Sequence, residues 1–588
     1  MNTLLWILFG LLLYTSIAMA LDARGKLPSS FQVSGPLLTI HTKRGRALLD
    51  WLATPRRFWR AWGNFGVGIA LVIMVGSFFS VLFSVYGTLS QPELALGIRP
   101  QDALVIPGVN QFLPLEAAVP IVFGLVVGLV VHEGGHGLLC RVEDIDIDSM
   151  GIALLAIVPL GAFVKPNEES QDEADRGGKT RMFAAGVTNN FLVTVVAFIA
   201  LFAIVGTLVS VVPGVAVGGA LPGSAAADAG VERGDVLTSV DGNPVENADE
   251  FAAALEDADR TVTVDRHESA PVTVERKLLV SRTVVDSPVE SGTEITAVEG
   301  TPVHTRSDFE AAVADRERVT LETDDGTVEI PIGAFSSTVM ADRPMAEAGV
   351  PDRPILVHSV GDEPTPTLAA LIDVLETTEP GEPIDIVVFV GEGDDPWNGD
   401  RRTFEVTPTA HPDRDGAQLG IAGLREGTSG IYLDDFGVDP YPATEYHGIL
   451  GGADIGSDPI TTFVRRIGAV LLLPFANLVD PALAYNFAGF TDDVASFYEV
   501  SGPLGAGAVF VLANLLFWTG WINLNLGVFN CIPSYPLDGG HILRSSVEAT
   551  LARLPIDATP WLASVITVGI SIIMIASVLG LLFIPRFV

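Results

Sequence analysis

Three residues inside a long apolar run have the types and spacing of a metal-dependent catalyst. His132, Glu133 and His136 form the sequence HEGGH near the end of residues 117–140, a run long enough to cross a bilayer as a helix. Residues four apart share one helix face, so both imidazoles can bind one ion. Two histidine nitrogens suit Zn²⁺, and the adjacent carboxylate can act as a base on water. Ionisable groups at this depth are costly, which disfavours a chance match in a buried helix.

A catalytic zinc site needs a third protein ligand and an open position for water. The best candidate is Asp538, in the sequence NCIPSYPLDGGH of residues 530–541. Prolines and glycines there break the helix and let a side chain turn into the bundle. Cys140 is a rival, because it lies four residues beyond His136 on the same helix face. The weaker rivals are Glu143, Asp144 and His541.

The composition indicates an apolar membrane part joined to a very acidic soluble part. Only 18% of the 588 residues are charged, yet the net charge is −37, with most of the acid between residues 213 and 457. Few lysines and abundant carboxylates are typical of halophilic archaea. The soluble part has no sustained basic patch, which disfavours nucleic-acid binding. It also contains neither of the two cysteines, so it has no disulfides.

Apolar runs and basic residues predict a multi-pass protein of the cell membrane. The runs cover residues 1–20 and about 65–90, 117–140, 181–212, 504–530 and 560–584. Basic residues gather in residues 21–62, so the positive-inside rule makes that loop cytoplasmic. Alternation then puts HEGGH toward the cytoplasmic side and the acidic region outside. For residues 1–20 we favour a retained anchor, while a cleaved signal peptide is the alternative.

Two further apolar segments are unsuited to crossing the membrane. Residues 151–164, GIALLAIVPLGAFV, are short and interrupted by Gly and Pro, which predicts a membrane-dipping β-hairpin or re-entrant loop. Within residues 458–485, Arg465 and Arg466 interrupt an apolar run. An amphipathic helix at the outer interface fits that pattern better than a span.

The acidic region contains an internal repeat. GDVLTSVDGNPVENADEF (234–251) and GTEITAVEGTPVHTRSDF (292–309) align without a gap, and residues 355–375 form a weaker third copy. Each copy predicts a strand, a tight turn and a helix. The first copy resembles a bacterial-type PDZ domain, the second lacks its Ala-Gly lead-in, and the third resembles it least. PDZ domains bind peptide termini or extended segments by strand addition, and a structural spacer is the alternative role.

These patterns together predict a multi-pass α-helical membrane protein with an inserted extracytoplasmic α+β region of tandem PDZ-like domains. The expected domains are an N-terminal membrane region with two spans and a two-part membrane catalytic core around the insertion. The predicted boundaries are 1–115, 116–212, 213–457 and 458–588, with PDZ-like copies at about 214–280, 281–335 and 345–425.

The chain from about residue 115 onward resembles the site-2 protease family of intramembrane zinc metalloproteases. The resemblance lies in HEGGH, AGVTNNF (185–191), the PDZ-like repeats and NLGVFNCIPSYPLDGG. Val187 stands where the family usually has proline. The resemblance implies Zn²⁺ on His132, His136 and Asp538, with Glu133 as the general base.

The resemblance also implies how substrates are bound. Asn530 resembles the family's substrate-contacting asparagine, and Asn190 is a second candidate; helix-packing hydrogen bonds are the alternative role of both. The 151–164 segment could add an extended substrate strand. External repeats would screen transmembrane substrates already trimmed by another protease. Rival functions are a non-catalytic membrane-anchored PDZ scaffold, which would not need Glu133, and a transporter, which would show repeated membrane halves.

Overall fold

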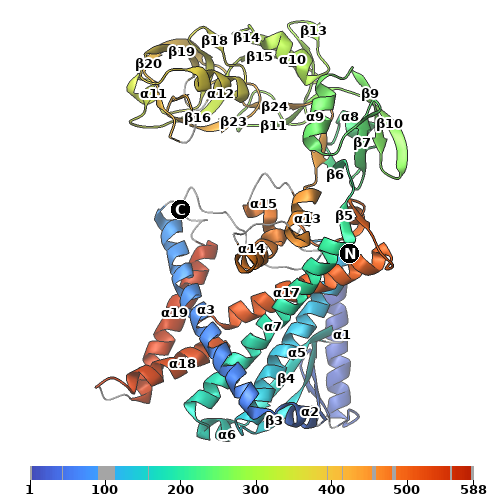
Figure 1. Cartoon of the computed structure of the whole chain (residues 1–588), viewed down its shortest axis with the longest axis vertical. Helices are drawn as coiled ribbons and strands as arrows, with labels where there is room; N and C mark the ends of the chain where they lie inside the picture. Colours follow the sequence, from blue (N-terminus) through green and yellow to red (C-terminus); the bar gives the residue numbers. More distant parts are fainter. Residues whose placement is uncertain are drawn as a thin grey trace. The chain divides into compact units, whose positions relative to one another are not determined.

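The computed structural model describes residues 3–28, 30–42, 44–90, 107, 113–155, 158–391, 393, 395–412, 415–452, 458–479, 485–555 and 559–583 (Figure 1). The chain forms two compact units. The helical unit comprises Met1–Ser210, Thr444–Asp492 and Glu499–Val588, and the repeat unit comprises Val211–Ala443 with Asp493–Tyr498.

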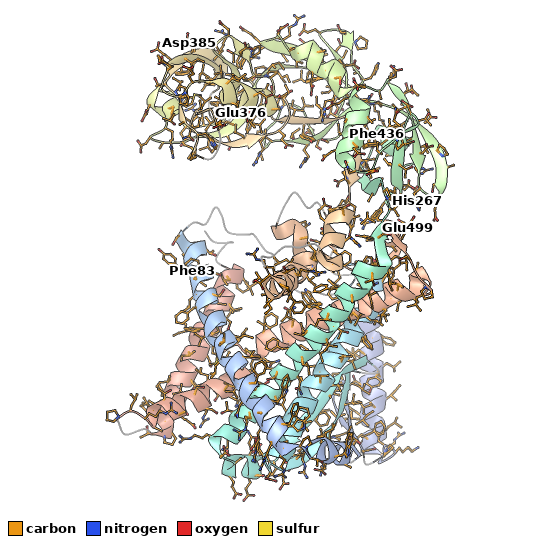
Figure 2. All side chains as sticks on the ribbon, viewed as in Figure 1. Phe83, His267, Glu376, Asp385, Phe436 and Glu499 are labelled. Atoms are coloured by element: carbon orange, nitrogen blue, oxygen red, sulfur yellow. The ribbon has the colours of Figure 1, made fainter. Side chains whose placement is uncertain are left out.

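Five helices of the described residues are long and apolar enough to cross a membrane. They are α3 (Arg56–Ser90), α5 (Ala118–Val142, after the 3₁₀ turn η2, Leu115–Ala117), α7 (Arg176–Leu208), α17 (Ala506–Asn530) and α19 (Pro560–Phe583). Large apolar side chains such as Phe83 of α3 point outward from them (Figure 2). The five runs predicted after residue 60 are therefore confirmed as long apolar helices.

Glycines set the close packing of α5, α7 and α17, which lie side by side (Figure 1). A Cβ at Gly124 of α5 would lie 2.8 Å from the carbonyl oxygen of Trp518 in α17. A Cβ at Gly527 of α17 would lie 2.6 Å from the ring of Phe191 in α7. Small residues let apolar helices approach closely where water supplies no driving force. These three helices form the frame of the candidate site.

Shorter helices complete the helical unit. They are α1 (Thr3–Ala23), α2 (Arg44–Leu52), α6 (Glu168–Glu173), α13 (Ala443–Gly451), α14 (Pro459–Leu472), η3 (Leu473–Phe475), α15 (Ala476–Val479), α16 (Asp492–Ala495) and α18 (Asp538–Leu551). The retained anchor expected at residues 1–20 forms helix α1, and its membrane crossing stays a prediction. Arg466 of α14 is not a free interfacial charge. It donates to the carbonyls of Ile449 and Leu450 and lies over the Phe202 ring at 3.9 Å.

A four-stranded antiparallel sheet belongs to the helical unit. Its strands are β1 (Phe31–Ser34), β2 (Leu37–His41), β3 (Ile147–Leu155) and β4 (Val158–Pro166), in that order. The β-hairpin predicted over residues 151–164 is confirmed as β3 and β4, and it is longer at both ends. The pairing of β2 with β3 was not predicted, because residues 21–62 were interpreted only as a basic loop. It leaves β4 at one edge of this sheet.

The repeat unit contains three sheets with the same strand order. The first repeat has β10-β9-β7-β6-β25, the second β15-β14-β12-β11-β24 and the third β20-β19-β17-β16-β23. Each repeat has its own buried apolar cluster. The predicted strand, turn and helix are confirmed in each, as β7-β8-α9, β12-β13-α10 and β17-β18-α12. Asn247, Thr305 and Thr367 cap the three helices at equivalent positions.

The bounds of these elements follow the chain. The first repeat contains β6 (Val215–Ala220), α8 (Ala225–Asp228), β7 (Val236–Val240), β8 (Asn243–Pro244), α9 (Ala248–Glu256), β9 (Thr261–Arg266) and β10 (Ser269–Glu275). The second contains β11 (Leu278–Thr283), β12 (Glu294–Val298), β13 (Thr301–Pro302), α10 (Arg306–Val313), β14 (Arg318–Thr323) and β15 (Gly326–Pro331). The third contains β16 (Ala334–Val339), α11 (Pro344–Glu347), β17 (Ile355–Val360), β18 (Glu363–Pro364), α12 (Leu368–Thr377), β19 (Ile384–Val390) and β20 (Asp400–Val406). Short strands β5 (Val209–Val211), β21 (Thr409–Ala410), β22 (Ala417–Gln418) and β26 (Tyr498–Val500) complete the set.

The fifth strand of each sheet comes from the returning chain, in reverse order. β23 (Ile421–Arg425) completes the third repeat, β24 (Ile431–Asp434) the second and β25 (Val438–Pro440) the first. The repeats are therefore nested, whereas the predicted boundaries were contiguous along the chain. A strand paired across more than 100 residues leaves no mark in a local repeat pattern.

The repeat unit also ends earlier than the acidic composition indicated. Its main segment stops at Ala443, and residues 444–457, which we assigned to the acidic region, fall in the part of the chain that belongs to the helical unit. His447 of α13 pairs through Nε2 with the carbonyl of Val209 at 2.8 Å, which holds α13 near the end of α7. Composition averages over such a boundary and cannot locate it.

Candidate metal centre

Helix α5 brings the two histidines of HEGGH to one point. The Nε2 atoms of His132 and His136 lie 3.1 Å apart. His132 is buried, and both side chains are at most 12% exposed. The shared face expected from the four-residue spacing is therefore present in the structure.

Asp538 reaches the histidines from the first residue of α18. Its Oδ2 lies 3.1 Å from His132 Nε2 and 3.3 Å from His136 Nε2. The tight connection between α17 and α18 depends on two glycines. A Cβ at Gly539 would meet the carbonyls of Cys531 and Ile532, and one at Gly540 would lie 2.9 Å from the Ser534 carbonyl. The DGG sequence therefore folds the chain back so that its aspartate faces α5.

The donor set fits a tetrahedral zinc ion. Three ligand atoms, one from each side chain, lie within 4.8 Å of one another. Bonds of about 2.0–2.2 Å to a tetrahedral Zn²⁺ would separate such atoms by about 3.3 Å. His136 Nδ1 donates to the Met182 carbonyl at 2.8 Å in the tautomer that leaves Nε2 with a lone pair toward Asp538.

A cation compensates the charge of this cluster. Burial opposes ionisation of Asp538, but the adjacent imidazoles hold its pKa well below its usual range, so the carboxylate is negative. Its Oδ2 is buried and has no hydrogen-bond partner. A converging set of lone pairs around an orphaned carboxylate oxygen matches the requirement of a divalent metal.

The rival ligands are bound elsewhere. Cys140 is fully buried in an apolar cluster. Glu143 receives two hydrogen bonds from Arg181, at 2.8 and 3.1 Å. Asp144 is paired with Arg56, whose hydrogen bond lowers the pKa of that carboxyl. His541 stacks on Phe183 with ring centroids 4.3 Å apart, and burial lowers its pKa.

Helix α7 supplies the space and the support for the histidines. A Cβ at Gly186 would lie 2.7 Å from His136 Nε2 and 2.9 Å from His132 Nδ1, so only glycine fits. Asn190, fully buried, places its amide nitrogen 3.5 Å from His132 Nδ1, while its oxygen has no partner. The opposite amide orientation gives the ring N–H an acceptor. Asn190 thus adjoins a ligand and is shielded from solvent.

Glu133 is tied to the hairpin. The backbone N–H of Val164 in β4 donates to its Oε2 at 2.8 Å, and the side chain is only half-buried. The carboxylate adjoins the histidines in sequence without joining their cluster of ligand atoms. This arrangement suits a base that must remain accessible to water.

Asn530 is the last residue of α17 and is half-buried. Its Nδ2 donates to the Leu526 carbonyl of the same helix at 3.0 Å, which leaves its amide oxygen for another group. Sequence reasoning missed two contributors to the site, Met182 and Gly186. The first acts through a backbone carbonyl, which has no sequence signal, and the second lay unrecognised within AGVTNNF.

Comparison with known proteins agrees with this geometry. The profile of Peptidase family M50 matches residues 120–576, which include every candidate ligand. The chain belongs to peptidase family M50. The M50 match begins just after the N-terminal membrane region and spans both parts of the core, on either side of the repeat unit.

Individual relatives of this M50 member are more distant. A Clostridium perfringens protein named "Putative zinc metalloprotease" is 27% identical over 150 residues, which cover 22% of this chain and 43% of the relative. A Brucella suis protein with that name is 28% identical over 183 residues, covering 25% and 48%. An uncharacterized protein of Methanocaldococcus jannaschii is 26% identical over 220 residues, covering 37% and 56%. The chain thus spans about half the length of the curated relatives it matches.

Proposed function

We propose that this chain is an intramembrane zinc metalloprotease that hydrolyses peptide bonds within or near transmembrane segments of other membrane proteins. The supporting observation is the convergence of His132, His136 and Asp538 next to Glu133, on helices apolar enough to span a membrane. A site of this kind is costly in an apolar environment and has no evident structural purpose there.

Each residue has a distinct role in the proposed reaction. Zn²⁺ bound to the three ligands would polarise the scissile carbonyl and make water acidic enough to attack near neutral pH. Glu133 takes the proton of the attacking water and passes it to the leaving amine. The hydrogen bond from Val164 holds this carboxylate at a fixed position. The Met182 carbonyl and Asn190 orient the two imidazoles.

The hairpin is the proposed substrate platform. An unwound substrate segment can add to the edge of a sheet through main-chain hydrogen bonds. In the four-stranded sheet, β2 covers the outer side of β3, so β4 is the edge next to Glu133. Asn530, with a free amide oxygen, is proposed to bind the main chain of the same segment.

We further propose the sidedness and partners expected from the charge distribution. The active site faces the cytoplasmic side of the cell membrane, and the PDZ-like repeat unit lies outside and screens substrates. The partners are the lipid bilayer and transmembrane proteins already trimmed by another protease. The net charge of −37 disfavours nucleic acid as a partner.

Replacement of the base tests the reaction. Glu133→Gln keeps the size of the side chain and removes the proton acceptor, so we expect full zinc content and at least a ~10²-fold loss of cleavage. Quantitative mass spectrometry of membrane fragments from cells with the wild-type chain and with the variant measures the loss. Identical fragments from both strains would contradict the proposal and favour a non-catalytic scaffold.

A further inference from the structure

The repeat unit contains three equivalent grooves, each between the helix of a repeat and its returning edge strand. The grooves lie between α9 and β25, α10 and β24, and α12 and β23, with volumes of about 240, 410 and 120 Å³. Each edge strand is the last strand of its sheet. An edge strand beside an apolar groove is a general site for an added peptide strand.

The loop before each edge strand has the same backbone design. Gly437, Gly430 and Gly420 precede the three strands with φ of +89°, +77° and +76°. Their carbonyls accept from Leu221, Val284 and Met340, which are equivalent residues of the three repeats. A left-handed glycine turns successive N–H groups toward one side, where they can bind an anion. The three loops differ in what these N–H groups bind.

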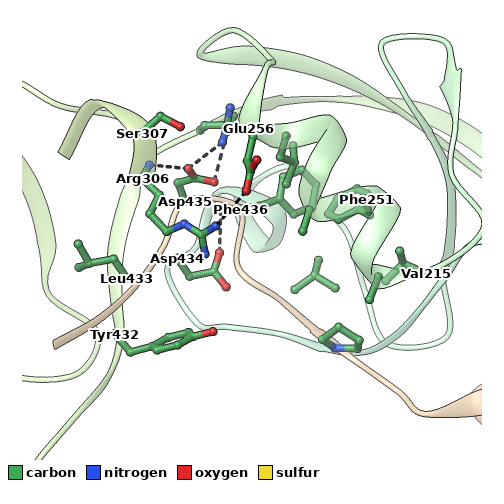
Figure 3. Close-up of a pocket in the computed structure, with 16 residues that line it drawn as sticks. Val215, Phe251, Glu256, Arg306, Ser307, Tyr432, Leu433, Asp434, Asp435 and Phe436 are labelled. Carbon is green, nitrogen blue, oxygen red and sulfur yellow. Dashed lines mark hydrogen bonds and ion pairs between the residues drawn. The ribbon is translucent and has the colours of Figure 1, made fainter. Parts of the chain in front are cut away.

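In the first repeat, the protein's own carboxylate takes the N–H groups. Asp434 Oδ1 accepts from the N–H of Phe436 at 2.8 Å and of Gly437 at 2.6 Å. Figure 3 shows Asp434 beside Phe436 in this groove. The adjacent Asp435 is held by Arg276. A ligand carboxylate would have to displace Asp434 and would meet its charge.

In the second repeat, the loop is closed by its own backbone. The N–H of Ser429 donates to the Gly333 carbonyl at 2.9 Å, and that of Ile431 donates to the Thr428 carbonyl at 2.8 Å. Only one N–H of this loop, that of Gly430, is left without a recorded partner among the described residues. A single donor does not make a carboxylate site.

In the third repeat, the equivalent N–H groups have no hydrogen bond to any described residue. They belong to Leu419 and Gly420, which are buried and line the groove. Unpaired buried backbone donors are rare and call for a partner. The groove wall beyond them is apolar, with Leu375, Ile421 and Leu424 among its residues. Its volume of about 120 Å³ suits one aliphatic side chain.

We propose that the third repeat binds the free carboxyl terminus of a polypeptide with an aliphatic last residue, and that the first two repeats do not. The terminal carboxylate accepts from the N–H groups of Leu419 and Gly420, the last side chain enters the apolar groove, and the preceding residues pair with β23. Exposed Glu376 and Asp415 at this groove favour a basic residue among those preceding positions. This binding goes beyond the proposed proteolysis and does not require it.

Peptide binding to the full-length protein in detergent micelles tests the proposal. The probes are fluorescein-labelled decapeptide pools that end in Val or Leu, with a free carboxylate or with the same end amidated. We expect one bound peptide per chain and at least ~tenfold weaker binding after amidation, since two hydrogen bonds to a charged group are lost. Equal affinity of the two pools, or no binding of either, would overturn the proposal. Cleavage is not measured, so the outcome is independent of the proposed protease activity.

A carboxylate transplanted from the first repeat identifies the groove. Ala417 occupies the position of Asp434, two residues before the first loop N–H. Ala417→Asp should therefore weaken binding at least ~tenfold by covering the N–H groups of Leu419 and Gly420, while Ala417→Val should bind as the wild type does. Thermal unfolding of both variants controls for folding, and the amidated pool decides the matter if the aspartate variant does not fold. Unchanged affinity of a folded Ala417→Asp protein would exclude the third groove.

Discussion

At the scale of single residues, Gly186 determines whether the two histidines can occupy their positions. A methyl group there would lie 2.7 Å from His136 Nε2, against the atom that binds the metal. We expect Gly186→Ala to lower the zinc content of the purified protein at least ~tenfold, because metal affinity depends on ligand orientation. Elemental analysis by mass spectrometry measures it. Gly134→Ala is the matched control, since a Cβ at Gly134 meets nothing within 4 Å. Equal zinc in both variants would contradict the assignment.

The third ligand has its own test. Asp538→Asn removes the charge that neutralises the metal, so we expect zinc affinity to fall at least ~10²-fold while the fold is retained. Cys140→Ser should keep its zinc, because Cys140 is buried in an apolar cluster away from the histidines. Competition with a zinc-chelating dye gives both affinities. The reverse pattern would move the third ligand to Cys140.

Residue types and spacing predicted the chemistry of the site better than its support. The pair of histidines four residues apart required only a helix, and Asp538 stood out because its PLDGG sequence breaks one. The carbonyl of Met182 and the N–H of Val164 are backbone groups, which every residue possesses, so no sequence pattern marks them. The rivals Glu143 and Asp144 could be set aside only after Arg181 and Arg56 were found beside them.

At the scale of elements, a buried ion pair joins the first two repeats. Arg276, between β10 and β11, donates to Asp435 at 2.7 Å, and the two side chains are 3% and 8% exposed. Asp435 also accepts from the backbone N–H of Arg306 at the start of α10 (Figure 3). One carboxylate therefore links the end of the first sheet, the second helix and the connection between two edge strands.

Breaking this pair should destabilise the repeat unit. Asp435→Ala leaves a guanidinium buried without its partner, and we expect a loss of about 3–5 kcal/mol in the free energy of unfolding. Glu275→Ala removes an exposed pair with Arg260, and should cost about 1 kcal/mol or less. Limited proteolysis across a urea series measures both on the full-length protein. Similar losses in the two variants would show that the buried pair is not a junction.

Local patterns predicted the elements that are made from adjacent residues. The apolar runs, the 151–164 hairpin and the strand, turn and helix of each repeat all depend on periods and turns within about 20 residues. The strands β23, β24 and β25 pair across much longer separations, and the pairing of β2 with β3 joins residues more than 100 apart. For the same reason the resemblance to a PDZ domain was clearest in the first copy, although the open loop lies in the third.

At the scale of the whole molecule, the repeat unit should decide which substrates reach the helical unit. If it screens by size, replacing residues 213–442 with a short flexible linker should let an untrimmed membrane substrate be cleaved as fast as a trimmed one. The intact protein should prefer the trimmed substrate. Initial rates on the two substrates in proteoliposomes give the ratio, with Glu133→Gln as the inactive control. An unchanged ratio after the replacement would remove the proposed filter.

The returning strands also fix the order in which the repeats are completed during synthesis. The third repeat obtains its edge strand first, and the first repeat, although made earliest, must wait for β25. More than 200 residues separate β25 from β6, its partner in the first sheet. At ~5–20 residues per second, that delay is roughly 10–40 s. For that time β6 presents an unpaired edge to other nascent chains, and a polypeptide that ends prematurely near residue 428 would possess one complete groove, the third.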